Sequence, residues 1–282
     1  MFSSYIMWYL FFAGAGSGSY VLAALFSYVN RFSPHAHVRE YLQIARGGFL
    51  CGPLLVLFSV LFLIFDLGSP HKAYLIFIAP TFTVLSVGAW LILLFVTGSA
   101  LLFFIRRTLS FRVARTFVLA LEAATFLFAL GVMGYTGVFI SSMPSLPFLN
   151  SPVVIPLFIA SSLSTGAAVI TLFGFLNQQK KSMLFSMRII PTLDLIFIVG
   201  ETVFLLALFI MALAGSSETA HVSALELISG DVAPLFWGLV VGSGLIVPGC
   251  IGVFERRQLR PSLLALSALL LLIGGLALRY CL

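Results

Sequence analysis

Eight long apolar stretches occupy nearly the whole chain. They cover residues of about 5–29, 47–65, 79–105, 113–141, 153–177, 191–214, 234–254 and 262–280. One helix needs about 20 apolar residues to cross a hydrocarbon core that is about 30 Å thick. The sequence therefore predicts an all-α polytopic membrane protein, with eight transmembrane helices in helical bundles. No connecting segment is long enough to form a soluble domain, so residues 1–282 are expected to form a single integral membrane domain.

The composition and the first stretch support this assignment. Hydrophobic residues make up 61% of the chain and charged residues 9%, whereas about a quarter of the residues in a soluble domain are charged. The first stretch has no preceding basic region and no cleavage site of small residues, so it is predicted to be a retained helix rather than a signal peptide. Gly14 and Gly18 within it form a GxxxG pattern, which favours close helix packing.

The basic residues indicate an orientation in a membrane rather than nucleic-acid binding, although the net charge is +6. All 15 Lys and Arg except Lys72 and Arg279 lie in alternate connections, beginning with the one between the first and second stretches. By the positive-inside rule, both termini and the loops around 66–78, 142–152 and 215–233 face outward. Arg279 is expected to snorkel to the outer interface.

Three carboxyl groups fall inside the predicted spans, where ionisable groups are costly and commonly functional. Glu122 lies in the middle of the fourth span. Asp194 and Glu201 lie seven residues apart in the sixth span, which places them within about 20° of one helix face and about 10 Å apart along the axis. We expect this column to face the bundle interior or a water-filled path. An ion pair with Arg188 is the alternative for Asp194.

Further polar side chains are predicted near the outer face, close to the ends of their spans. One of them, Asp66, is open to two interpretations: a turn residue in contact with water, or a proton acceptor beside the imidazole of His71. A run of serine, threonine and glycine at 161–166 is interpreted as a helix-packing surface, and the glycines and proline at 242–249 predict a kink. The outer group comprises Tyr9, Asp66, His71, Tyr135 and Thr136.

The histidines and cysteines argue against a haem or a metal centre in this chain. A haem bound within a membrane needs axial ligands on the spans, typically histidine, and the three cysteines lack metal or iron–sulfur spacing. A quinone brings its own redox chemistry, so it needs only hydrogen-bond partners and a proton route. The four histidines all fall in predicted loops: His35, His37, His71 and His221.

Short motifs follow one another in order along the chain. They are YLFFAG at 9–14, DLGSP at 66–70, SVGAW at 86–90, YTG at 135–137 before a proline-rich loop, LFIAS at 157–161 with STG at 164–166, Asp194 with Glu201, and Gly274-Gly275 with Arg279-Tyr280. As an ordered set they resemble the NrfD-like family of polysulfide-reductase-type membrane subunits. The resemblance covers essentially the entire chain.

This resemblance implies a haem-free anchor in a bacterial or archaeal cytoplasmic membrane, and not an enzyme by itself. The anchor would exchange electrons, as in anaerobic respiration, between menaquinone or ubiquinone and a ferredoxin-like iron–sulfur subunit that serves a molybdopterin-type catalytic subunit on the outer face. The resemblance also implies an outer quinone pocket with Tyr135 as a headgroup ligand. Tyr9 lies closest to the position where some members have a histidine, and Ser69 replaces the usual arginine of the DLGSP stretch.

The leading hypothesis is therefore a quinone-reactive membrane subunit that also has a proton route. A secondary transporter, in which the acid column carries a coupling ion, is the main alternative, and a structural anchor with inert acids is a third. The roles assigned under the leading hypothesis are headgroup binding for Tyr9, Tyr135 and Thr136, surface proton transfer for Asp66 and His71, and an inward proton route for Glu122, Asp194 and Glu201.

Overall fold

A computed structural model describes residues 4–32, 38–66, 83–108, 114–143, 148–177, 180–215, 218–255 and 260–282. The described residues form helices joined by turns. The helices are α1 (Ser4–Phe32), α2 (Val38–Asp66), α4 (Val84–Thr108), α5 (Arg115–Ser141), α6 (Val154–Leu176), α7 (Lys180–Ala214), α8 (Glu218–Ser229), α9 (Ala233–Leu235), the π-helix η2 (Phe236–Ile246), α10 (Val247–Glu255) and α11 (Pro261–Cys281).

Eight helical segments among these residues are long and apolar enough to cross a membrane, which confirms the predicted fold class. The seventh is the continuous run Ala233–Phe254 through α9, η2 and α10. Predicted and observed bounds differ by a few residues in most spans. The third span was expected from residue 79, but its helix begins at Val84, and residues 79–82 lie outside the described ranges.

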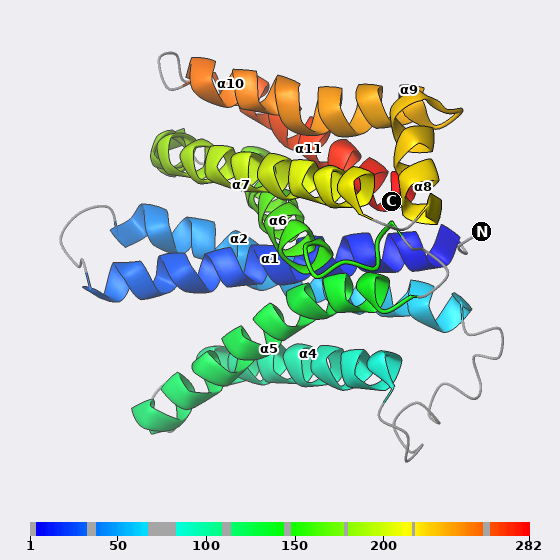
Figure 1. The fold of residues 1–282 in the computed structure, drawn as a ribbon. Coiled ribbons are helices and arrows are strands. Elements are labelled where there is room, and N and C mark those ends of the chain that lie inside the picture. The colour runs from blue at the N-terminus through cyan, green and yellow to red at the C-terminus, as the bar shows by residue number, and fades with distance from the viewer. Residues whose placement is uncertain are drawn as a thin grey trace.

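Most of the long helices run in one general direction (Figure 1), with both chain ends at one end of the bundle and α8 standing across that end. The C-terminal end of α1 and the start of α2 lie at the opposite end. We call these the terminal end and the basic end. The first half of α2, the last turn of α4 and the start of α11 lie toward the second, and among the described residues they carry Arg46, Arg106, Arg107 and Arg260. The sequence places most of its basic residues in alternate connections, and the described ones among these accordingly lie at one end of the bundle, opposite the chain termini.

The centre of the bundle is α1, which packs against α2, α5, α6 and α11. Of its apolar window 78% is buried, compared with 22% for α5. Glycines allow the close approach to α6: a Cβ atom at Gly18 would collide with the backbone of Ser162, and one at Gly166 would collide with the backbone of Gly18. The close packing predicted from the GxxxG pattern is confirmed.

The seventh span is wound more widely than an α-helix over η2, and its last turn is closed by a bond from the Val247 N–H to the Gly242 carbonyl, five residues earlier. The glycines and proline that predicted a kink thus accompany a π-helical stretch, as is common where an α-helix is interrupted. Here η2 packs closely against α11 where Gly244 meets Gly274. A Cβ atom at Gly274 would collide with Gly244.

Candidate functional site

Tyr9 of α1 and Tyr135 of α5 meet in the core of the bundle. Both side chains are buried, and Tyr9 is 0% exposed. Their hydroxyl groups are near enough to interact, but neither has a hydrogen-bond partner in good geometry among the described residues. A buried hydroxyl without a partner costs free energy and calls for an explanation. This pair is therefore the place in the core that best suits an external polar group.

Two glycines shape the surroundings of Tyr135. A Cβ atom at Gly88 of α4 would collide with the Tyr135 ring, and one at Gly137 would press on the backbone of Ile155 in α6. The Thr136 side chain is also buried, but its hydroxyl donates to the Met133 carbonyl at 2.6 Å. Of the predicted headgroup ligands, the structure thus brings Tyr9 and Tyr135 together, whereas the Thr136 hydroxyl is bonded within its own helix.

Arg279 lies inside the bundle, which corrects the expectation that it snorkels to the interface. It is 4% exposed. Its Nη1 donates to the Gly275 carbonyl at 2.8 Å and to the Ser161 hydroxyl at 3.3 Å, and its Nη2 donates to the Ser162 hydroxyl at 3.3 Å. A buried charge needs such partners. The serines that supply them belong to α6, so a pattern read along α11 alone does not reveal them.

Aromatic rings and a glycine complete the pocket around the Arg279 guanidinium. Its Cζ lies 5.7 Å from the centre of the Phe11 ring and 5.4 Å from that of Phe158, distances that suit cation–π attraction. A Cβ atom at Gly14 would come within 2.7 Å of the arginine's Nη2. The glycine of the YLFFAG motif therefore leaves room for this side chain.

The two carboxyl groups of α7 face the same interior. Glu201 is 6% exposed, and its carboxyl group interacts with the Ser161 hydroxyl and with the charge of Arg279. Asp194 is 7% exposed and accepts a hydrogen bond of 2.8 Å from Ser164. The prediction that this column faces the bundle interior is confirmed. The side chain of Arg188, the alternative partner of Asp194, lies outside the described residues.

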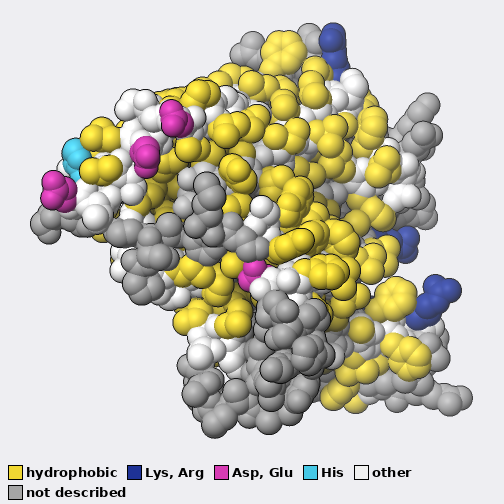
Figure 2. Space-filling view, turned by 90° about the vertical axis from the view of Figure 1, so that its right-hand side faces the viewer, with side chains coloured by type: hydrophobic (Ala, Val, Ile, Leu, Met, Phe, Trp, Pro, Cys, Tyr) yellow, Lys and Arg dark blue, Asp and Glu magenta, His cyan; other side chains and the backbone are white. Residues whose placement is uncertain are grey.

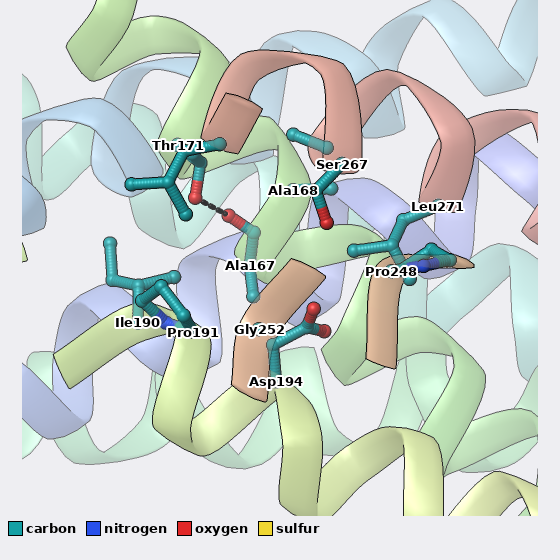
Figure 3. Close-up of a pocket in the computed structure, with 12 residues that line it drawn as sticks. Ala167, Ala168, Thr171, Ile190, Pro191, Asp194, Pro248, Gly252, Ser267 and Leu271 are labelled. Carbon is teal, nitrogen blue, oxygen red and sulfur yellow. Dashed lines mark hydrogen bonds between the residues drawn. The ribbon is translucent and has the colours of Figure 1, made fainter. Parts of the chain in front are cut away.

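The Asp194 carboxyl group also borders a small cavity of about 20 Å³ (Figure 3), whose walls come from α6, α7, α10 and α11. That volume suits a single water molecule, provided that polar groups surround it. Ser267 of α11 is a second polar side chain in the wall. Pro248 is also in the wall, and because a proline has no N–H, it cannot satisfy the carbonyl one turn earlier in its helix.

Three serines of α6 therefore connect the buried charges: Ser161 and Ser162 bond Arg279, Ser161 also contacts Glu201, and Ser164 bonds Asp194. We call these three the serine ridge. The sequence interpretation of this run as a packing surface holds for Gly166, but it missed the polar contacts. The sequence does contain a signal for these contacts, namely an arginine within a predicted span, which requires hydroxyl or carbonyl partners on a neighbouring helix.

Glu122 lies elsewhere. Its Oε1 is 2.6 Å from Nη2 of Arg106 at the end of α4, and the two side chains are 21% and 42% exposed. Asp66 is the last residue of α2 and is half-buried, whereas His71 lies outside the described residues. The structure therefore does not bring Glu122 to the serine ridge, and its described partner is a basic residue of the hairpin that α4 and α5 form.

No three His, Cys, Asp or Glu side chains within the described ranges come together in a way that could hold a metal ion. The arrangement is that of a polytopic helical membrane protein with a pair of buried tyrosines and, in its interior, a polar path built from carboxyl groups, serines and one arginine. Comparison with known proteins identifies the family: the chain belongs to the polysulphide reductase, NrfD family, whose model matches residues 1–282.

Individual relatives agree with this assignment. The protein is 30% identical to a polysulfide reductase subunit of Wolinella succinogenes over 292 residues, with 96% of this chain and 90% of the relative covered. It is 27% identical to protein NrfD of Escherichia coli and 25% identical to a protein NrfD homolog of Haemophilus influenzae, with the same coverage of both sequences in each pair. The resemblance inferred from the ordered motifs is thereby confirmed.

Proposed function

We propose that this chain is the membrane anchor subunit of a respiratory oxidoreductase complex, in which it exchanges electrons between a membrane quinone and a partner iron–sulfur subunit. Membership of a family that includes a polysulfide reductase subunit supports a role inside such a complex. The observation that carries the quinone assignment is the pair of buried tyrosine hydroxyls, neither of which has a hydrogen-bond partner in good geometry among the described residues. The chain is not an enzyme on its own in this proposal.

The tyrosine pair fits a quinone headgroup by its chemistry. A tyrosine hydroxyl donates a hydrogen bond, and the oxygens of a quinone are acceptors, so Tyr9 and Tyr135 would hold the headgroup, with menaquinone and ubiquinone both suitable. When bound, a quinone supplies two-electron redox chemistry that is coupled to protons. The residues of the chain bind it, orient it and exclude water, because the side chains of both tyrosines are buried.

The proton route follows the serine ridge in this proposal. Glu201 and Asp194 are the groups that hold a proton, Ser161 and Ser164 connect to them, and the cavity beyond Asp194 admits one water. That cavity is lined by the first half of α7 and by Pro248 and Gly252 of α10, and these segments lie toward the basic end. Glu122 would serve a separate proton entry at that end, beside Arg106.

The proposed orientation has the basic end in the cytoplasm and the terminal end outside a bacterial or archaeal cytoplasmic membrane, as the positive-inside rule predicts. The iron–sulfur and molybdopterin-type subunits would dock on the terminal end. Figure 2 looks onto this end, where acidic side chains gather near a histidine among hydrophobic ones; α8 carries Glu218, His221 and Glu226. Asp66 and His71 would exchange protons with water here, and residues 1–282 would act as one domain.

The test is to change Tyr135→Phe and Tyr9→Phe in the intact complex, with Tyr280→Phe as the control because that side chain is 59% exposed. Loss of one hydrogen bond to the headgroup removes about 1 kcal/mol, so we expect kcat/KM for quinone to fall by about five- to tenfold in each core variant. Quinone that co-purifies should fall as well. Unchanged turnover and quinone content in both core variants would contradict the proposal.

A secondary transporter is the second candidate, because buried acids on one helix face also suit a coupling ion. Solute uptake by the purified chain alone in liposomes separates the two, since an anchor subunit without its partners has no transport of this kind. Uptake that Glu201→Gln abolishes would favour the transporter.

A further inference from the structure

Two adjoining cavities open between α1, α2, α4 and α5 toward the basic end, away from the tyrosine pair and the serine ridge. Their volumes are about 670 Å³ and about 300 Å³. The residues that line both, and so form the wall between them, are Tyr20, Ser27, Phe49, Arg106 and Glu122. The ion pair between Arg106 and Glu122 is therefore part of this shared wall.

The larger cavity is cationic at its rim. Arg46 of α2 and Arg106 and Arg107 of α4 line it, and Glu122 is the acidic residue among its lining side chains. Arg106 already pairs with Glu122, and its Cζ lies 5.1 Å from the centre of the Phe49 ring. Arg46 and Arg107 add two exposed positive charges. The cavity thus has an excess of positive charge and suits an anion.

The smaller cavity is mainly apolar beyond the shared wall, where its lining residues are Ala24, Leu25, Tyr28, Leu119, Ala123 and Phe126. It lies beside the larger cavity, where α1 and α5 form its walls beyond the residues that the two cavities share. A cavity with a cationic rim beside a hydrophobic recess, at the end of a transmembrane bundle, has the polarity of one lipid molecule.

We propose that the two cavities together bind one anionic phospholipid, with its phosphate against Arg46 and Arg107 and an acyl chain in the smaller cavity. Guanidinium groups match phosphate oxygens in geometry and charge, and basic pockets between spans on the cytoplasmic side attract anionic headgroups. A neutral quinone headgroup gains nothing from the excess charge. The lipid would also join α2 to α4, which contact each other far less than α4 contacts α5.

The experiment measures bound lipid in the purified chain by native mass spectrometry, after exchange in nanodiscs of phosphatidylglycerol or of phosphatidylcholine. The test variant combines Arg46→Gln with Arg107→Gln. The matched control is Arg260→Gln, an exposed arginine at the start of α11 and outside both cavities. We expect retained phosphatidylglycerol to fall about tenfold or more in the double variant, because charge-assisted bonds are lost, and to stay unchanged in the control.

A second variant tests the recess without altering any charge. Ala123→Phe fills the smaller cavity, and Val203→Phe, at an exposed position of α7, is its control. Only Ala123→Phe should release phosphatidylglycerol, by about threefold or more given the lost apolar burial. Equal retention of phosphatidylcholine by the wild type would overturn the proposal. So would unchanged phosphatidylglycerol in both test variants, or a quinone found in the wild type and lost from the arginine variant.

Discussion

Gly88 is the residue on which the position of Tyr135 depends most directly, because a methyl group there would meet the phenol ring. We expect Gly88→Ala to lower the free energy of unfolding by about 1–3 kcal/mol, the usual cost of overpacking, and to reduce quinone-dependent turnover. Gly134→Ala is the control, since a Cβ atom at that position has nothing within 4 Å. Its effect on stability should stay within about 1 kcal/mol. Equal losses in the two variants would refute the packing argument.

The interaction between Arg279 and Glu201 leads to the second prediction at this scale, because both are buried ionisable groups. Removal of one partner leaves the other charge uncompensated, so Arg279→Gln should cost about 3–5 kcal/mol of stability. Unfolding in a denaturing detergent measures this cost. The double variant with Glu201→Gln should be less destabilised than the sum of the single variants, by about 0.5–3 kcal/mol. Additive effects would mean that the two side chains act independently.

At the scale of elements, α6 matters because it carries the serine ridge between α11 and α7. The hydrogen bond from Ser164 to Asp194 leads to a prediction about proton transfer that can be tested separately from quinone binding. In proteoliposomes that contain the intact complex, Asp194→Asn should slow proton transfer across the membrane by about tenfold or more, because an amide cannot take part in acid–base transfer. Ser164→Ala should slow it less. Quinone binding should persist in both, and Thr97→Val, at an exposed position of α4, serves as the control. Normal proton transfer in Asp194→Asn would remove the ridge from the route.

The same element also marks the limit of what a sequence reveals. Helix number, the inward face of Asp194 and Glu201, and the glycine packing of α1 follow from periodicity and polarity along single spans. The burial of Arg279 and the pairing of Glu122 with Arg106 depend on which helices are neighbours. Side-chain packing between spans decides which helices are neighbours. The hydrophobic periodicity of a single span does not contain that information.

For the whole molecule, the unequal ends of the bundle make the orientation a physical consequence of charge. Moving an arginine-rich end across the bilayer is disfavoured, so the basic end should remain in the cytoplasm. Single cysteines report this in a background in which Cys51, Cys250 and Cys281 are replaced by serine. Ser229→Cys, in α8, tests the terminal end, and Arg260→Cys tests the basic end.

In intact cells a membrane-impermeant maleimide should label Ser229→Cys and leave Arg260→Cys unmodified. After permeabilisation both should react, which controls for accessibility because both side chains are exposed. The reverse pattern would place the partner-docking end in the cytoplasm, and it would assign the cationic lipid cavity to the outer leaflet. Labelling of both sites before permeabilisation would place Ser229 and Arg260 on the same side of the membrane. That result would require an even number of spans between them. With the single span Ala233–Phe254 between them, opposite labelling is the expected result.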